Sequence, residues 1–208
     1  MKINAVLFDA DGVIQTTRPD FIPRLKALVG TRHQDADRFV GEIFAVEKPC
    51  LTGEADFAVE LADLLNRWQV ESSVDDVISG WHSIEPISPV TDLIRNLRLN
   101  GTLCCLATNQ QQYRASFMKT TLRYESLFER QFYSHEMGVV KPDIRYFQYI
   151  LSAISLPAAQ TLFIDDNESN VEAARSLGIN GLVFNAALFA DPGAALSSAL
   201  EGFDIQPQ

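Results

Sequence analysis

The sequence is poor in cysteine, in basic residues and in long apolar runs. Lys and Arg total 17 against 27 Asp and Glu, which gives a formal net charge of -10 at pH 7. Nucleic acids and anionic membrane surfaces are bound through basic patches. We therefore expect no nucleic acid and no membrane as a partner, and an anionic substrate would need local cations to overcome the negative field of the chain.

No apolar stretch near the amino terminus is long enough for a targeting or membrane segment. The first run stops at Asp9, whereas a signal-peptide core takes about 7 to 15 apolar residues and a membrane span about 18. These features predict a cytoplasmic protein. The chain also contains no repeats and no low-complexity tract.

The three cysteines, Cys50, Cys104 and Cys105, are odd in number, and the last two are neighbours in a predicted strand. Adjacent residues of a strand point to opposite faces of its sheet. We interpret these cysteines as buried apolar side chains rather than as reactive thiols or metal ligands. With 47% hydrophobic and 21% charged residues, the 208-residue chain can bury a full core.

The apolar pattern changes along the chain and indicates a two-part organisation. Residues 5–8 form an apolar run typical of a strand covered on both faces of a parallel sheet. Residues 15–88 carry apolar side chains at helical spacing, which predicts a small helical module without a convincing strand. From Pro89 onward, strands alternate with helices, which is the pattern of a doubly wound α/β domain with a parallel sheet.

The strands predicted in this second part cover residues 103–107, 131–134, 161–164 and 181–184. A helix is predicted before them, over residues 90–99, and helices are predicted between them, over residues 114–121, 143–154 and 168–177. The tail after Asp191 predicts a last helix or a loose end.

Polar side chains follow the first two strands of the predicted sheet. Asp9, Asp11 and Gly12 come directly after the first strand, and in open α/β sheets ligands bind at the carboxyl ends of the strands. Thr108 and Asn109 follow the second strand, where a hydroxyl beside the N–H groups of a helix start can hold an anion. Each feature alone would also suit an N-cap or a turn.

A lysine and a second acidic pair extend this pattern. Lys141 precedes Pro142, which keeps the lysine out of helical geometry and lets it reach inward; an ordinary surface lysine is the alternative. Asp165 and Asp166 end another apolar strand. Two acidic pairs at strand ends indicate bound Mg²⁺, which takes oxygen ligands, because clustered carboxylates are costly without a cation. Two unrelated helix caps are the other interpretation.

Together, these segments resemble the four motifs of the haloacid dehalogenase-like (HAD) hydrolase superfamily, at Asp9-Ala10-Asp11-Gly12, Leu106-Ala107-Thr108-Asn109, Lys141-Pro142 and Ile164-Asp165-Asp166-Asn167. The resemblance implies a Rossmann-like core domain, residues 1–14 and 89–208, with strand order 5-4-1-2-3. It also implies that residues 15–88 are a helical cap domain inserted after the first strand. Residues 138–143 and 165–170 are most similar to the sugar-phosphate phosphatase branch, including its glucose-1-phosphatase-like members.

The resemblance further implies catalytic roles. Asp9 would attack phosphorus and form an aspartyl-phosphate. Asp11 would protonate the leaving oxygen and then take a proton from the hydrolytic water, and its acidic neighbours and partial burial are expected to keep it protonated near neutrality. Thr108 and the amide of Asn109 would bind the phosphoryl oxygens, while Lys141 would offset charge on the nucleophile and the phosphate.

The implied cofactor is Mg²⁺, held by the Asp9 carboxylate and the backbone carbonyl of Asp11. The second acidic pair would complete the site, with Asp166 favoured over Asp165 as the direct ligand. The predicted activity is hydrolysis of a small phosphorylated metabolite, a sugar phosphate or a related monoester, by a monomer or weak homodimer. Three alternatives stay open: a phosphate-binding or regulatory protein with little turnover, a phosphomutase, and a 2-haloacid dehalogenase, which uses a lone aspartate and does not need Asp11.

Overall fold

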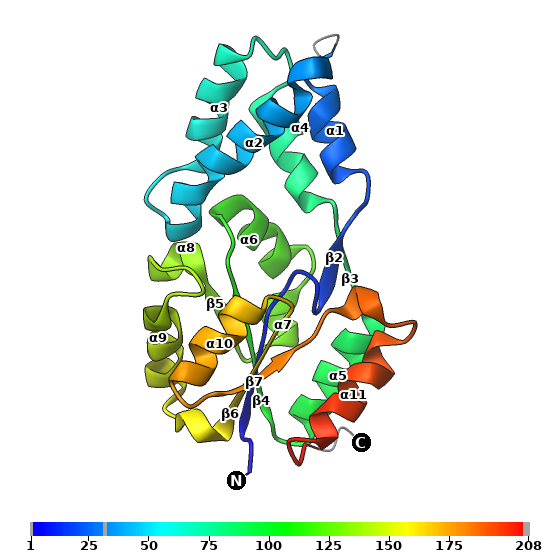
Figure 1. Ribbon diagram of the computed structural model, residues 1–208, viewed down its shortest axis with the longest axis vertical. Coiled ribbons are helices and arrows are strands. Elements are labelled where there is room, and N and C mark those ends of the chain that lie inside the picture. The colour runs from blue at the N-terminus through cyan, green and yellow to red at the C-terminus, as the bar shows by residue number, and fades with distance from the viewer. Residues whose placement is uncertain (1, 31–32, 206–208) are drawn as a thin grey trace.

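The computed structural model describes residues 2–30 and 33–205, and these residues include a five-stranded parallel sheet, which lies in the lower half of the molecule in Figure 1. The sheet consists of β1 (Ala5–Phe8), β4 (Leu103–Thr108), β5 (Arg130–Tyr133), β6 (Thr161–Asp165) and β7 (Asn180–Val183). The strands lie in the order β5-β4-β1-β6-β7. When these five strands are numbered 1 to 5 in chain order, the sheet read from β7 has the order 5-4-1-2-3, as predicted. The predicted fold class is therefore confirmed.

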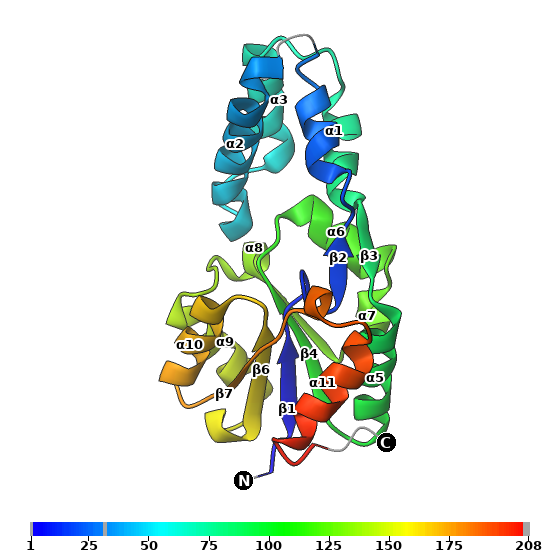
Figure 2. The ribbon, with the colours of Figure 1, turned by 45° about the vertical axis from the view of Figure 1, so that its right-hand side comes forward.

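Helices cover both faces of the sheet (Figure 2). One face is covered by α5 (Ser88–Leu99) and α11 (Pro192–Glu201), the other by α9 (Ile144–Ile154) and α10 (Glu168–Ser176). Because strand residues alternate in direction, the fully buried Phe8 packs into the first of these cores and Leu7 into the second. Cys104 and Cys105 are free, fully buried and face opposite cores, as predicted.

A second group of helices lies beyond the carboxyl ends of the strands (Figure 1). It comprises α1 (Phe21–Ala27), α2 (Ala36–Glu47), α3 (Phe57–Arg67) and α4 (Val74–Ile78). In α3, the Asp56 side chain caps the N-terminus by accepting from two backbone N–H groups, and Leu61 and Leu64 face an apolar core shared with the other helices. These helices therefore bury an apolar cluster separate from the two that flank the sheet.

Two short strands within residues 15–88 were not predicted. β2 (Gln15–Thr17) and β3 (Ile84–Pro86) pair antiparallel, with Gln15 opposite Pro86. This ribbon holds together the two ends of the segment where it leaves and rejoins the sheet (Figure 1). Each strand has only 3 residues, so its extended conformation depends on its partner rather than on local sequence. The expectation of a segment without strands was wrong on this point.

Shorter elements connect these parts. They are α6 (Gln112–Thr120), α7 (Tyr124–Leu127), α8 (Ser134–Met137) and the 3-10 turns η1 (His33–Asp35), η2 (Lys48–Thr52), η3 (Ser79–His82), η4 (Ala158–Gln160) and η5 (Ala186–Leu188). α6 joins the sheet to the second group of helices, because Gln112 Nε2 and Tyr113 Oη donate to the Asp56 carboxylate at 2.6 and 2.9 Å. Within residues 2–30 and 33–205, no helix is both long and apolar enough to cross a membrane.

The packing of α3 can be tested with two substitutions on the same helix. Leu61 is fully buried, whereas Val59 is 59% exposed. We expect Leu61→Ala to lower the free energy of unfolding by about 2–5 kcal/mol, because it leaves a cavity among the helices. The control, Val59→Ala, should change it by less than about 0.5 kcal/mol. Urea unfolding followed by circular dichroism measures both, and equal losses would contradict a packed core here.

Candidate active site

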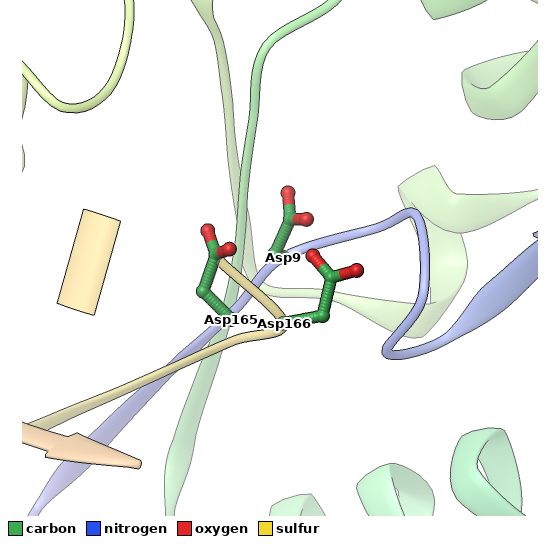
Figure 3. A group of neighbouring side chains, drawn as sticks. All are labelled: Asp9, Asp165 and Asp166. Carbon is green, nitrogen blue, oxygen red and sulfur yellow. The ribbon is translucent and has the colours of Figure 1, made fainter. Parts of the chain in front are cut away.

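Three carboxylates meet at the carboxyl ends of two neighbouring strands. Asp9 directly follows β1, and its backbone N–H donates to the carbonyl of Ile164 on β6 at 2.8 Å. Asp165 ends β6 and Asp166 comes next. One oxygen from each of Asp9, Asp165 and Asp166 lies within 4.8 Å of the others (Figure 3). Such a set of oxygen atoms suits a hard cation such as Mg²⁺.

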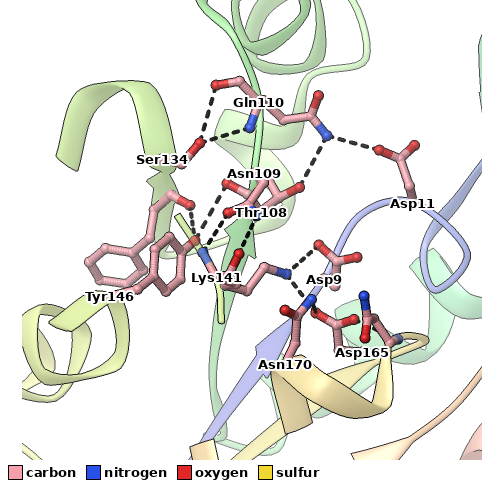
Figure 4. Close-up of polar contacts among 12 residues, drawn as sticks. Asp9, Asp11, Thr108, Asn109, Gln110, Ser134, Lys141, Tyr146, Asp165 and Asn170 are labelled. Carbon is pink, nitrogen blue, oxygen red and sulfur yellow. Dashed lines mark hydrogen bonds and ion pairs between the residues drawn. The ribbon is translucent and has the colours of Figure 1, made fainter. Parts of the chain in front are cut away.

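Lys141 lies buried among these acids. Its Nζ donates to Asp9 Oδ1 at 2.7 Å and to Asp165 Oδ2 at 2.6 Å (Figure 4). Asn170 Nδ2 also donates to Asp165 Oδ2, at 2.9 Å. The Asn109 amide fixes the backbone of Lys141, accepting from its N–H at 2.9 Å and donating to its carbonyl at 3.0 Å. The residue after β4 thus positions the lysine.

The pKa values of this group follow its charge balance. Burial raises the pKa of Asp9 to about 7, although the Lys141 ammonium lowers it. Burial and the nearby Asp165 raise the pKa of Asp166. Burial alone would lower the pKa of Lys141, but the Asp9 and Asp165 carboxylates raise it. The acids therefore carry more negative charge than one lysine stabilises, and a divalent cation fits these residues because it favours ionised carboxylates.

Asp11 points away from this group and toward α6. Arg114 donates to both of its oxygens, from Nη2 to Oδ1 at 2.7 Å and from Nη1 to Oδ2 at 2.9 Å. Gln15 Nε2 and Gln110 Nε2 add hydrogen bonds of 3.0 and 2.9 Å. Burial alone would raise the pKa of Asp11, but Arg114 and these amides bring it below its usual value. The expectation of a protonated Asp11 was therefore wrong for this arrangement, because its partner is a cation rather than another acid.

Thr108 lies at the end of β4, beside β1, and is 1% exposed. Its Oγ1 accepts from Gln110 Nε2 at 3.1 Å, and Gln110 in turn contacts Asp11 (Figure 4). The structure therefore brings the predicted site residues to one edge of the sheet: Asp9, Asp11, Thr108, Asn109, Lys141, Asp165 and Asp166.

Sequence reasoning missed several polar residues of this edge. Gln110 lies in the loop between β4 and α6, Arg114 lies in the first turn of α6, and Asn170 lies in the first turn of α10. A search for polar side chains in the first helical turn after each strand could have found them. Gln15 could not be found this way, because its contact with Asp11 depends on the unpredicted strand β2.

A cavity of ≈ 320 Å³ opens beside Asp11, between this edge and the second group of helices. Asn109, Gln110 and Arg114 line it from the edge. The helical segment contributes Thr17, Phe21, Phe44, Glu47, Leu51, Gly80 and Trp81. A second cavity, of ≈ 440 Å³, is lined mainly by residues of α5 and α7, and the lining includes none of the predicted site residues.

The carboxylates, the buried lysine and the threonine at this edge form a candidate site for a cation and an anion, and comparison with known proteins names the family. The model of the haloacid dehalogenase-like hydrolase family matches residues 3–178. The chain belongs to that family, which confirms the resemblance seen in its motifs. A sesquiterpene phosphatase, astK, from Aspergillus oryzae is 33% identical over 100 residues, or 48% of this chain and 50% of that protein. The matched parts cover half or less of the curated relatives' own lengths.

Solved structures share the fold. A HAD-like family hydrolase from Porphyromonas gingivalis has a TM-score of 0.79 and 22% identity, covering 96% of this chain and 98% of that one. A HAD family enzyme from Bacteroides thetaiotaomicron, in complex with magnesium and inorganic phosphate, has a TM-score of 0.73 and 21% identity, covering 86% and 93%. At such identities the likeness establishes the fold alone.

The close approach of Gly12 to the acids gives a test of the site. Gly12 has a φ of +77°, and an added Cβ would lie 2.5 Å from Asp166 Oδ2 and 3.2 Å from Asp166 Cβ. We expect Gly12→Ala to displace the Asp166 carboxylate, to cost about 1–3 kcal/mol of stability, and to reduce stabilisation by added Mg²⁺. Urea unfolding with and without Mg²⁺ measures both effects.

Gly101 provides the matched control. It has a φ of +84°, but an added Cβ would meet nothing within 4 Å. Gly101→Ala should therefore carry the backbone cost and keep the full response to Mg²⁺. An unchanged Mg²⁺ response in Gly12→Ala would count against a cation site at Asp166.

Proposed function

We propose that this hydrolase is a Mg²⁺-dependent phosphatase that hydrolyses a small phosphate monoester through an aspartyl-phosphate on Asp9. The observation that carries the proposal is the convergence of Asp9, Asp165 and Asp166 around the buried Lys141. A phosphatase among the curated relatives and a fold neighbour in complex with magnesium and phosphate support it.

The first half-reaction uses Asp9 as nucleophile. A carboxylate oxygen attacks phosphorus in line with the leaving alcohol, so that a bond from phosphorus to Asp9 forms while the bond to the leaving oxygen breaks. Lys141 donates to Asp9 Oδ1, which leaves Oδ2 for the attack. The Thr108 hydroxyl and the backbone N–H of Asn109 bind the phosphoryl oxygens beside it.

The acids divide between holding the cation and supporting the site. Asp165 is fully buried and accepts hydrogen bonds from Lys141, Asn170 and the Asn167 backbone N–H. Asp166 is exposed, which supports the assignment of Asp166 as the direct ligand together with Asp9 and the Asp11 carbonyl. Bound there, Mg²⁺ would stabilise negative charge on the phosphoryl oxygens.

Asp11 acts as the general base of the second half-reaction, for which its lowered pKa is suited. Water attacks the phosphorus of the aspartyl-phosphate, Asp11 accepts the proton of that water, and the bond to Asp9 breaks to release phosphate. In the first half-reaction the leaving oxygen takes its proton from Asp11, and the proton that Asp11 accepts from water restores this acid form for the next turnover, although the Arg114 contact opposes it. Residues 15–88 act as the cap that covers the cavity and excludes water.

Two substrate classes have support. Residues 138–143 and 165–170 favour a sugar phosphate or related metabolite, whereas the curated sesquiterpene phosphatase favours a terpenoid alcohol as leaving group. Neither class changes the roles of Asp9 and Lys141. A lone-aspartate dehalogenase would not use the second acidic pair, and a phosphomutase differs only in excluding water from the same intermediate.

The nucleophile is tested by Asp9→Asn. We expect this variant to lose p-nitrophenyl phosphate hydrolysis by a factor of about 10³ or more, because an amide does not attack phosphorus. Removal of Mg²⁺ by a chelator should abolish wild-type turnover reversibly. The control is Asp92→Asn, whose side chain is 69% exposed on α5. Retained turnover in Asp9→Asn would exclude Asp9, and mass spectrometry of acid-quenched wild-type enzyme should detect phosphate on it.

The acid role is tested by Asp11→Asn with leaving groups of different pKa. We expect kcat/KM to fall about 10²- to 10⁴-fold for alkyl phosphates and far less for p-nitrophenyl phosphate, because a good leaving group needs no proton. Steady-state kinetics across such a series measures the difference. A uniform loss for all leaving groups would contradict proton donation by Asp11.

A further inference from the structure

One wall of the cavity beside Asp11 is aromatic. It consists of Phe21 on α1, Phe44 on α2 and Trp81 in η3, and we refer to these three side chains as the aromatic wall. Phe21 lies 5.2 Å from Trp81 and 6.5 Å from Phe44 between ring centroids, in edge-to-face contacts. Phe57 packs against Trp81 from behind at 4.9 Å. The wall is therefore held in place by the core of the helical segment.

The exposure of the wall indicates that it serves a ligand. Phe21 and Trp81 are 9% and 4% exposed, but Phe44 is 36% exposed and lines the cavity. A large aromatic side chain that lines a cavity together with Asp11 offers apolar surface to a ligand that enters it. Leu51 in η2 extends this apolar surface.

Few polar groups face the cavity from the helical side. Thr17 accepts a hydrogen bond from Arg114 Nη2 at 3.3 Å, so its hydroxyl is already engaged. Glu47 is the other polar side chain there, and burial raises its pKa to about 7, although the Arg114 guanidinium and a hydrogen bond with Trp81 lower it. A sugar would bring several hydroxyl groups to this wall, and buried hydroxyls without partners are costly. A hydrocarbon needs no such partners.

The polar and the aromatic residues that line the cavity come from different parts of the molecule. Asp11, Asn109, Gln110 and Arg114 line the end next to the sheet. A phosphate at the carboxyl ends of β1 and β4 would therefore send its leaving group toward the aromatic wall. The volume of ≈ 320 Å³ falls at the lower end of the range for small-molecule sites.

From this arrangement we propose that the cavity selects phosphate monoesters of apolar alcohols, with the hydrocarbon packed against Phe21, Phe44 and Trp81, in preference to sugar phosphates. The inference rests on the proposed phosphatase function and names its substrate class. It makes Phe44 a specificity-determining residue, because it is the most exposed member of the aromatic wall.

The test is a series of n-alkyl phosphates from ethyl to octyl, compared with glucose 6-phosphate. We expect kcat/KM to rise about threefold for each added methylene until the cavity is filled. Hexyl phosphate should exceed glucose 6-phosphate by about tenfold or more, although both are six-carbon esters of a primary alcohol. A flat series, or a preference for the sugar phosphate, would overturn the inference.

Two serine variants locate the effect. Phe44→Ser should reduce kcat/KM for octyl phosphate about tenfold and flatten the dependence on chain length. Phe189→Ser is the control, because Phe189 is a phenylalanine of comparable exposure, 44%, outside this cavity. A general loss of structure would lower all substrates alike, so an unchanged slope in Phe44→Ser would contradict the role of the wall.

Failure of the proposed function is distinguishable from failure of this inference. If wild-type enzyme releases phosphate from p-nitrophenyl phosphate but shows no chain-length dependence, the proposed function is supported and the proposed substrate class is wrong. If no ester is turned over, calorimetric binding of the same alkyl phosphates to Asp9→Asn decides the inference alone. Affinity that rises with chain length supports it, and constant affinity overturns it.

Discussion

The site depends on one buried ion cluster, in which Lys141 bridges Asp9 and Asp165 at 2.7 and 2.6 Å. Its carboxylates come from the ends of adjacent strands, and its lysine comes from the loop that Asn109 holds. Taking these charges out of water is costly, and the cost is offset only while every partner keeps its place. The cluster therefore ties β1, β6 and the loop after α8 into one geometry, and any displaced member leaves a buried charge unpaired.

The two aspartates of the first motif show how neighbours give similar groups different properties. Asp9 and Asp11 are two positions apart, yet burial raises the pKa of Asp9 to about 7 and Arg114 lowers that of Asp11 against the effect of burial. Lys141 is shared with Asp165, so Asp9 is only partly compensated, whereas Asp11 accepts hydrogen bonds from a guanidinium and from two amides. A nucleophile works as an ionised carboxylate and a general acid in its protonated form, which is the reverse of this order. A divalent cation held by Asp9 would favour its ionised form and lower its pKa.

Much of the fold could be predicted because its signals are local. Apolar runs ending in Asp9, Thr108 and Asp165 mark buried parallel strands, and the edge where they end follows from their direction. Which side chain each site residue contacts could not be predicted, because the contacting residues are distant in sequence. Arg114 lies 103 residues from Asp11 along the chain. The ribbon of β2 and β3 likewise pairs Gln15 with the distant Pro86. The cationic partner of Asp11 was therefore missed, although Asp11 itself was predicted as a site residue.

Helix α6 contacts both the sheet edge, at Asp11, and the helical segment, at Asp56. Its Arg114 holds Asp11, while Gln112 and Tyr113 hold Asp56 at the start of α3. Asp56 belongs to the same helical segment as the aromatic wall, so α6 contacts both the acid-base group and the part of the molecule that lines the leaving-group end of the cavity. In the proposed function, phosphoryl transfer takes place at the sheet edge, and the aromatic wall binds the alcohol. Because α6 contacts both, the helix that holds Asp11 through Arg114 also fixes the start of α3 through Asp56.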